Sequence, residues 1–369
     1  MVTLLNSDDI AQVLTPALCL EALEEAFRDL AEGTAATMLG REIVAARLAH
    51  KAFPDVPAGR AYYALEVQTS ALPRHRVAAL RLKSDVVHWP RLPTGYQRVK
   101  VAAAAGDRFC GLILLFDIET GEPLALMPDG LIQRMRVGAT SALGAKYLAR
   151  ADARTVGMIG AGWQAGAQLM TLVHVRPVER VRVFSPTRAR REAFAAEMSA
   201  QLGLPVIPVD SGEAAAEGAD ILHSATNTRG AATITAAMVR PGMHVGVISV
   251  EEIGEDVLAR ADVRATTRRP RMASSAYAIA GGSAADIRER EFEHGWWRDD
   301  ALWDRFIQLG DLIRGRAQGR RTPEEVTLFH SGGAAIQFAA VGARILAEAR
   351  RRELGRELPT EWFLQPYRP

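Results

Sequence analysis

The clearest chemical signal in the chain is a set of small residues at the spacing Gly-x-Gly-x-x-Ala: Gly160, Gly162 and Ala165. An apolar run precedes them and apolar residues at helical spacing follow. At the end of a strand, the first glycine permits a tight turn, the second lets the backbone approach a pyrophosphate, and the third small residue keeps the helix close to the sheet. A lone motif of this kind also occurs as a simple turn. Here it opens a strand–helix series, so it predicts a dinucleotide site at a helix N-terminus.

The end of the next predicted strand should select the nucleotide. In such domains an acidic residue there accepts a hydrogen bond from the ribose 2′-hydroxyl. This chain has Ser185, Thr187 and Arg188 instead, with Arg190 and Arg191 behind them. These groups can hold a 2′-phosphate, which favours NADP(H) while leaving NAD(H) possible. The alternative is that the arginines form the solvated first turn of the next helix.

Polar residues also follow the fourth and fifth predicted strands of the series: Thr226 with Asn227, and Glu251 with Glu252. Ligands of open α/β sheets bind at the carboxyl ends of the strands. Thr226 and Asn227 can therefore contact the nicotinamide half, and one of the two glutamates can act as a general acid or base. The sequence leaves open which glutamate does so, or whether both lie in a solvated loop.

Three cationic residues suit a substrate carboxylate. Arg81 and Lys83 lie two positions apart on a predicted strand and so face one side of a sheet, and Arg136 lies at the junction of two predicted domains. The alternatives are an exposed strand edge for the first two and a structural helix cap for Arg136. No His, Cys or Asp cluster has metal-ligand spacing, so we predict no metal.

The elements before residue 130 indicate a sheet-rich first domain. Thr15 and Pro16 predict the start of an amphipathic helix that ends at Gly33. Short apolar or alternating runs predict strands at 43–48, 77–83, 111–117 and 124–127, with a hairpin connection at 118–122. A helix should follow Gly130.

From residue 154 onward, strands alternate with helical patterns, which predicts a doubly wound α/β domain with a parallel sheet. Six strands are expected, at 155–160, 181–184, 205–209, 220–225, 243–249 and 262–265. Residues 268–300 fit no element. A further strand at 324–328 and a long helix to about Arg351 should return to the first domain.

Composition excludes several classes of protein. The 369 residues suit two domains, and 48% hydrophobic residues can build real cores. The 45 basic and 43 acidic residues give a net charge of +2, without the charge runs of a nucleic-acid-binding arm. Two cysteines, no signal-peptide pattern and no apolar run near the roughly 20 residues of a membrane helix predict a cytoplasmic protein. We expect no nucleic-acid or membrane partner.

Three ordered motifs, at 129–139, 160–164 and 326–333, resemble the ornithine cyclodeaminase and mu-crystallin family over nearly the whole chain. The resemblance implies a substrate-binding and dimerisation domain of the α+β class built from both chain ends, 1–130 plus 321–369. It further implies an inserted Rossmann NAD(P)-binding domain, 131–320, and a homodimer.

By the same resemblance, Arg136 holds the substrate carboxylate, Lys83 is the active-site lysine and Arg60 is an upstream substrate-binding arginine. The resemblance also implies contacts to the cofactor from Gly160, Ala161, Gly162, Trp163, Gln164, Ser185, Thr226, Ser331 and Gly332. Glu251 stands where cyclodeaminases carry a catalytic aspartate. Val137 replaces a usual threonine, and Gln337 with Phe338 interrupts an acidic pair common in the last helix.

The function expected from these residues is an NAD(P)H-dependent oxidoreductase that acts on the C=N bond of an imino acid or cyclic imine, or in reverse on an amino acid. Glu251 or Lys83 would transfer the proton. Two alternatives stay open. One is a cyclodeaminase that releases ammonia and recycles NAD, and the other is a non-catalytic protein that binds NADP(H) and a small acid, as mu-crystallin does.

Overall fold

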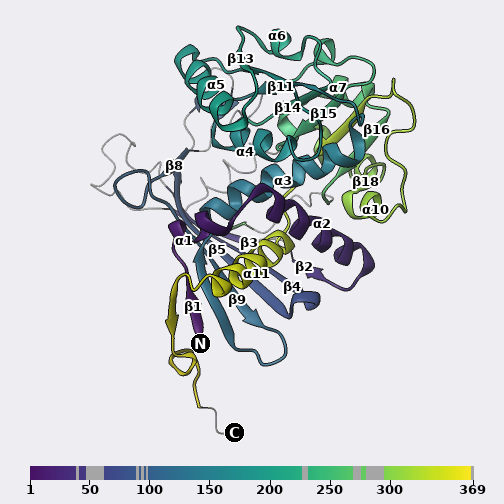
Figure 1. The fold of residues 1–369 in the computed structure, drawn as a ribbon. Helices are drawn as coiled ribbons and strands as arrows, with labels where there is room; N and C mark the ends of the chain where they lie inside the picture. Colours follow the sequence, from purple (N-terminus) through teal and green to yellow (C-terminus); the bar gives the residue numbers. More distant parts are fainter. Residues whose placement is uncertain are drawn as a thin grey trace.

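The computed structural model describes residues 1–38, 41–46, 62–88, 91–92, 95–96, 99–226, 232–268, 276–279 and 295–366. Arg60 and Asn227 lie outside the described residues. Two sheets dominate this part of the chain, and both chain ends lie near the first sheet (Figure 1).

The first sheet is mostly antiparallel and follows the order β17-β3-β4-β5-β9-β10-β1-β20, with β2 beside β4 and β8 beside β5. Its strands are β1 (Val2–Leu4), β2 (Ala36–Thr37), β3 (Arg41–Ala46), β4 (Tyr62–Leu72), β5 (Val77–His88), β8 (Val99–Val101), β9 (Cys110–Asp117), β10 (Pro123–Pro128), β17 (Ala276–Ile279) and β20 (Arg356–Leu358). A separate small hairpin joins β6 (Arg91–Leu92) and β7 (Gly95–Tyr96). The predicted strands and the β9–β10 hairpin are confirmed, except that residues 47–48 of the strand predicted at 43–48 lie outside the described residues. Strand β4, which pairs with β5 along its whole length, was not predicted.

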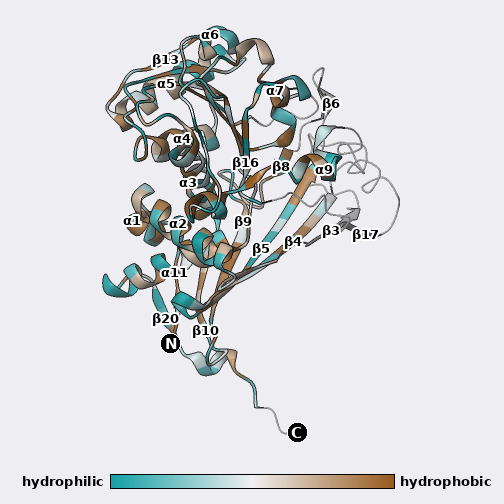
Figure 2. Cartoon of the chain, turned by 90° about the vertical axis from the view of Figure 1, so that its right-hand side faces the viewer, coloured by the Kyte–Doolittle hydropathy of each residue, from teal (hydrophilic) through white to brown (hydrophobic). Residues whose placement is uncertain are grey.

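Helices α1 (Ser7–Val13), α2 (Pro16–Glu32) and α11 (Ile336–Arg351) lie on one side of this sheet (Figure 2). The ends of α2 are as predicted. The Thr15 hydroxyl accepts from the Leu18 amide, Pro16 is the first helical residue, and Gly33 ends the helix in the left-handed region at φ 77°. The buried face of α2 supplies Leu23, Ala26 and Phe27 to the core that α11 also joins.

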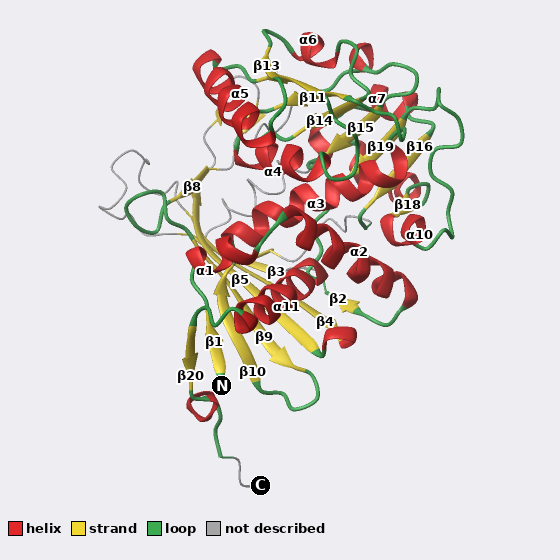
Figure 3. Ribbon diagram, in the orientation of Figure 1, coloured by secondary structure: helices red, strands yellow, loops and turns green. Residues whose placement is uncertain are grey.

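The second sheet is parallel throughout and follows the order β13-β12-β11-β14-β15-β19-β16-β18, with helices on both sides (Figure 3). Its strands are β11 (Thr155–Ile159), β12 (Arg180–Phe184), β13 (Val206–Pro208), β14 (Ile221–Ser224), β15 (His244–Val247), β16 (Val263–Thr266), β18 (Ile307–Gln308) and β19 (Thr327–His330). The helices include α4 (Trp163–Leu172), α5 (Arg188–Leu202), α6 (Gly212–Ala216), α7 (Glu255–Arg260), α9 (Asp300–Trp303) and α10 (Leu309–Ile313). The predicted α/β class with a doubly wound parallel sheet is confirmed.

The late strand β19 enters this sheet between β15 and β16. We predicted a strand at 324–328 that would return to the first domain, but it forms at Thr327–His330 and all four of its residues are buried. Such a strand is covered on both faces, which is typical of the centre of a parallel sheet. The helix α11 that follows does return, and it packs on β4, β5 and α2.

Helix α3 (Gly130–Leu148) connects the two sheets, because it packs against α2 on one side and α4 on the other. A Cβ at Gly138 would collide with the Ala167 carbonyl oxygen, so glycine lets α3 and α4 approach closely. At the C-terminus of α3, Arg176 donates to the Lys146 and Ala149 carbonyls, and Arg320 donates to the Leu148 carbonyl. These cations stabilise the negative end of the helix dipole.

Two buried histidines lie in neighbouring strands of the parallel sheet. His223 Nδ1 is 3.0 Å from Gln168 Oε1, and His244 Nδ1 is 2.9 Å from Thr327 Oγ1. Burial lowers the pKa of His223 from 6.5 to about 4, and it also lowers the pKa of His244. Both rings are therefore neutral in the folded protein at pH 7.

This burial predicts a loss of stability in acid. Below pH 6.5 the unfolded chain binds a proton at His223 that the folded chain does not, so the free energy of unfolding should fall as the pH drops towards 4. From His223 alone, the loss between pH 7 and pH 5 is about 2 kcal/mol. Urea titrations of wild type and His223→Gln at both pH values measure it, with the exposed His174→Gln as control. Equal pH dependence in wild type and His223→Gln would contradict the prediction.

Candidate functional site

The two glycines of the 160–165 motif are required for different reasons. Gly160 adopts φ 113°, and a Cβ there would collide with the Ala225 carbonyl oxygen. Gly162 is the N-cap of α4, has an ordinary negative φ, and a Cβ there would meet no described atom within 4 Å. The fold itself therefore needs glycine at 160 but not at 162. A ligand held against the backbone would need it at 162, which fits a diphosphate at this helix N-terminus.

Helix α3 braces this loop. Arg134 Nε donates to the Trp163 carbonyl at 3.1 Å, and the guanidinium lies 5.3 Å from the centre of the half-exposed Trp163 ring. Gln164 Oε1 is buried with no hydrogen-bond partner among the described residues. Ala161, Trp163 and Gln164 thus line the turn whose shape suits the predicted dinucleotide.

The polar residues that follow β12 have different roles in the structure. Arg191 is buried, forms an ion pair with Asp210 and donates to the Ser185 carbonyl at 3.2 Å, so it fixes the loop. Arg188 is exposed on the first turn of α5 and donates to Glu192 at 2.7 Å. Thr187 is the N-cap of that helix and makes no side-chain cap. Ser185, Thr187 and Arg188 therefore present their polar groups beside the carboxyl end of β12.

Glu252 joins the ends of β14 and β15. Its Oε1 accepts from the Ser224 hydroxyl and from the amide and hydroxyl of Thr226, while its Oε2 accepts from the amides of Ile248 and Ser249. Five donors at 2.7–3.0 Å occupy this buried carboxylate. The role of Glu252 is structural, and the Thr226 hydroxyl is used in a hydrogen bond to it.

Glu251 precedes Glu252 on the short 3-10 turn η3 (Val250–Glu252) and is 4% exposed. The proposed solvated loop is therefore wrong, because both glutamates are buried. With Glu252 bound to five donors, Glu251 is the one of the pair that we retain as the candidate acid or base.

Arg136 is buried, and its hydrogen-bond partners among the described residues are neutral. Its Nε and Nη2 donate to Gln133 Oε1 at 3.1 and 2.7 Å, its Nη1 donates to Gln337 Oε1 at 2.7 Å, and its guanidinium carbon lies 5.1 Å from the Phe338 ring centre. Burial, with a contribution from the like charge of Arg81, lowers the pKa of Arg136 below the usual range of arginine. It is a desolvated cation without a bonded carboxylate in the described part of the chain.

The remaining hydrogens of this guanidinium matter for recognition. A guanidinium has five N–H bonds, and three of them are used here. One N–H on each terminal nitrogen is left without an acceptor in the described residues. Two such groups match the two oxygens of a carboxylate.

Arg81 and Lys83 lie in the same cluster and both have acidic partners. Arg81 donates to Asp129 Oδ2 at 2.8 Å and its guanidinium lies 4.4 Å from the Phe338 ring centre. Lys83 forms an ion pair with Glu66, its cross-strand neighbour. Burial opposes the ionisation of Glu66, but Lys83 and then Arg81 outweigh it and bring its pKa down to about 2. An exposed strand edge, our alternative for Arg81 and Lys83, is wrong.

The sequence reasoning missed the partners that complete this cluster. Glu66 lies on the unpredicted strand β4, and its opposite charge at the position facing Lys83 was the available signal. Asp129 and Gln133 both precede Arg136 within the predicted motif. Gln337 and Phe338 come from α11, about 200 positions further along, and no local pattern connects them to Arg136.

The turn after β19 brings the two halves of the site together. The Ser331 amide donates to the Val247 carbonyl at the end of β15. A Cβ at Gly333 would lie 3.1 Å from Arg136 Nη1, so the turn passes beside the guanidinium. Ser331 and Gly332 therefore lie between the carboxyl edge of the parallel sheet and Arg136.

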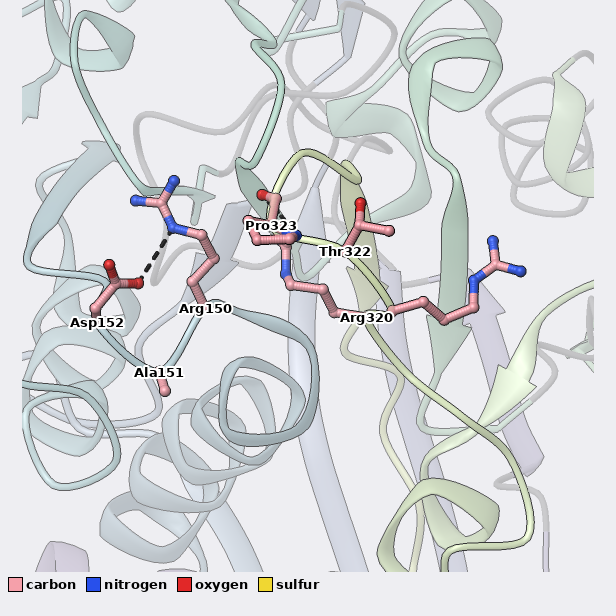
Figure 4. A pocket seen from close by; sticks show the side chains of 7 residues that line it. Arg150, Ala151, Asp152, Arg320, Thr322 and Pro323 are labelled. Carbon is pink, nitrogen blue, oxygen red and sulfur yellow. Dashed lines mark hydrogen bonds and ion pairs between the residues drawn. The ribbon is translucent and has the colours of Figure 1, made fainter.

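A pocket of about 450 Å³ lies elsewhere, beside the segments that lead into β11 and β19, and its lining includes Arg150, Asp152, Arg320 and Pro323 (Figure 4). Arg150 and Arg320 in this pocket already have partners within the protein. Arg150 forms ion pairs with Asp152 and Asp220, and Arg320 donates to backbone carbonyls. It lies at the amino ends of the strands, opposite the edge where ligands of such sheets bind.

Within the described residues, no group of three or more His, Cys, Asp or Glu side chains could hold a metal ion. Likewise, none of the helices described is long and apolar enough to cross a bilayer.

A family model described as the ornithine cyclodeaminase/mu-crystallin family matches residues 98–352. The chain belongs to this family. The match includes the three motifs on which the resemblance was based, and the structure has the α/β fold with a parallel sheet that the resemblance implied.

Individual relatives are similar over most of the chain. Delta(1)-pyrroline-2-carboxylate reductase of Bacillus cereus is 28% identical over 253 residues, 67% of this chain and 74% of the relative. Alanine dehydrogenase of Archaeoglobus fulgidus is 24% identical over 356 residues, 96% of this chain and 97% of the relative. The solved structure of Thermococcus litoralis Delta(1)-pyrroline-2-carboxylate reductase in complex with NADH and L-proline matches with a TM-score of 0.74 at 25% identity, covering 97% of this chain and 100% of that one.

The two glycines allow a test of the dinucleotide site. Gly162→Ala should fold normally, since its Cβ meets no described atom, but should weaken NADH and NADPH binding about tenfold or more because a methyl group would displace the diphosphate. Gly160→Ala is the control and should lower the melting temperature, because its backbone is left-handed and its Cβ collides with Ala225. Unchanged cofactor affinity in a folded Gly162→Ala protein would place the dinucleotide elsewhere.

Proposed function

We propose that this protein is an NAD(P)H-dependent reductase of the C=N bond of an imino acid or cyclic imine, able to act in reverse on the amino acid. The observation that carries the proposal is Arg136, a buried cation held by neutral groups beside the turn that links the two halves of the site. The pyrroline-2-carboxylate reductases among its relatives support the choice of substrate class.

In this proposal Arg136 binds the substrate carboxylate through its two remaining N–H groups. Phe338 covers the guanidinium face and keeps water from it. Arg81 and Lys83 stay close by as cations whose charges Asp129 and Glu66 balance, so they add polarity around the substrate without a second free charge. The bound nicotinamide supplies the hydride chemistry.

Reduction of a C=N bond also needs a proton. Lys83 forms an ion pair with Glu66, whose carboxylate is ionised at neutral pH, and Glu251 is buried near the strand ends. We propose these two residues as the candidates for proton transfer to the imine nitrogen. The hydrogen bonds of Glu252 leave it out of this role.

The charge pairing also favours an imine over a diamino acid such as ornithine. A cationic side chain would need an anion beside it, but Glu66 and Asp129 are already bonded to Lys83 and Arg81, and Glu251 is assigned to proton transfer. A cyclodeaminase would release ammonia without net cofactor use, whereas a reductase consumes NAD(P)H. A protein that binds the cofactor and an acid without turnover would do neither.

We further propose that NADPH is preferred to NADH and that two copies of the chain form a dimer. The first point rests on Ser185, Thr187 and Arg188 in place of an acidic residue. The second rests on the first sheet, where the half-buried Leu80, Leu82 and Leu114 alternate with buried residues along β5 and β9 and so lie on the opposite face of the sheet from them. An apolar sheet face of this kind favours association with a second copy.

Substitution of Arg136 tests the carboxylate contact. Arg136→Lys and Arg136→Met should each lower kcat/KM for Δ1-pyrroline-2-carboxylate at least about 100-fold, because an ammonium or thioether cannot make two parallel bonds to a carboxylate. Both variants should leave the melting temperature and NADPH affinity close to wild type, because no carboxylate among the described residues is bonded to Arg136 and would lose its partner. Turnover, calorimetry and cofactor titration measure these quantities. Near-normal turnover in both variants would remove Arg136 from the site.

Cofactor choice is tested at Arg188. Arg188→Ala should weaken NADPH binding about 10- to 100-fold, the value of a hydrogen bond between a cation and a phosphate, and change NADH binding little. Arg180→Ala, which removes an exposed arginine from the other end of β12, is the matched control. Equal affinities of the wild-type protein for the two cofactors would contradict the preference.

A further inference from the structure

Gln337 lies at the centre of the hydrogen bonds around Arg136. It is fully buried on the first turn of α11. Its Oε1 accepts from Arg136 Nη1 at 2.7 Å and from the Ala334 amide at 2.9 Å, and its Nε2 donates to the Thr140 hydroxyl at 2.5 Å. That hydroxyl in turn donates to the Arg136 carbonyl at 2.7 Å. One amide therefore ties the guanidinium to α11 and to the backbone of α3.

The three cations of the cluster differ in what balances them. Arg81 is paired with Asp129 and Lys83 with Glu66, so each has a carboxylate. Arg136 contacts two glutamine oxygens and an aromatic ring. Gln133 and Gln337 have the shape of glutamate but carry no charge, so they orient the guanidinium without neutralising it.

We propose that Gln337 is a positioning residue that fixes the direction of the Arg136 guanidinium and, by being neutral, keeps its charge available to the carboxylate of the substrate. The inference rests on the proposed function for the identity of that substrate. A glutamate here would occupy the same space and form an internal ion pair with Arg136, which would neutralise the guanidinium and repel the carboxylate of the substrate.

The test compares Gln337→Glu with Gln337→Met. Gln337→Glu should raise KM about 100-fold with kcat within a few-fold of wild type, because the added negative charge weakens the attraction of Arg136 for the substrate carboxylate without changing the position of the guanidinium. Gln337→Met keeps the charge of Arg136 free but removes the tether, so it should raise KM and lower kcat together. NADPH affinity should be unchanged in both. Gln201→Glu, on the exposed face of α5, controls for the added charge.

A binding measurement makes the test independent of turnover. With NADP⁺ present, wild type should bind L-proline more tightly than prolinamide, which lacks the carboxylate, and Gln337→Glu should lose that difference without a lower melting temperature. If wild type shows this binding but reduces no imine, the proposed function fails and the role of Gln337 stands. If Gln337→Glu keeps wild-type KM and L-proline affinity, or if wild type does not distinguish L-proline from prolinamide, the inference is overturned.

Discussion

The arrangement of this molecule depends on one buried charge. Moving a guanidinium out of water costs several kcal/mol unless an anion or strong acceptors replace the water. Arg136 has acceptors but no bonded anion in the described chain, so its surroundings must be rigid enough to hold a cation that would otherwise turn towards solvent or a carboxylate. Gln133 on the same helix, Gln337 on α11 and the ring of Phe338 supply that rigidity. The remaining favourable partner for the charge is a bound carboxylate.

The helix that carries Arg136 also connects the cluster around Arg136 to the glycine loop after β11. Residues two apart on a helix point about 200° apart, so Arg134 and Arg136 leave α3 on nearly opposite sides. Arg134 donates to the Trp163 carbonyl in the loop after β11, while Arg136 reaches α11. The arginines at the C-terminus of α3 and the close contact at Gly138 fix the helix against the parallel sheet. A shift of α3 would therefore move both binding surfaces together.

Which features the sequence could predict depends on how far apart in the chain the interacting residues lie. The caps of α2, the β9–β10 hairpin and the glycine loop depend on residues close together in the chain, and all three formed as predicted. The insertion of β19 between β15 and β16 and the contact of Arg136 with Gln337, 201 positions away, depend on the whole topology. The positions of Arg81 and Lys83 in the cluster depend likewise on β4, whose Glu66 had to lie opposite Lys83.

The two adjacent glutamates show how burial separates residues that a sequence cannot. Both follow β15 and both are buried, yet Glu252 accepts hydrogen bonds from donors on the ends of β14 and β15. By accepting hydrogen bonds from both strand ends, the Glu252 carboxylate holds the carboxyl ends of β14 and β15 next to each other. A carboxylate whose two oxygens are occupied by five donors is fixed in place, so it is poorly suited to transferring a proton to a bound substrate. The hydrogen bonds of Glu252 also fix the backbone of the short turn on which Glu251 lies.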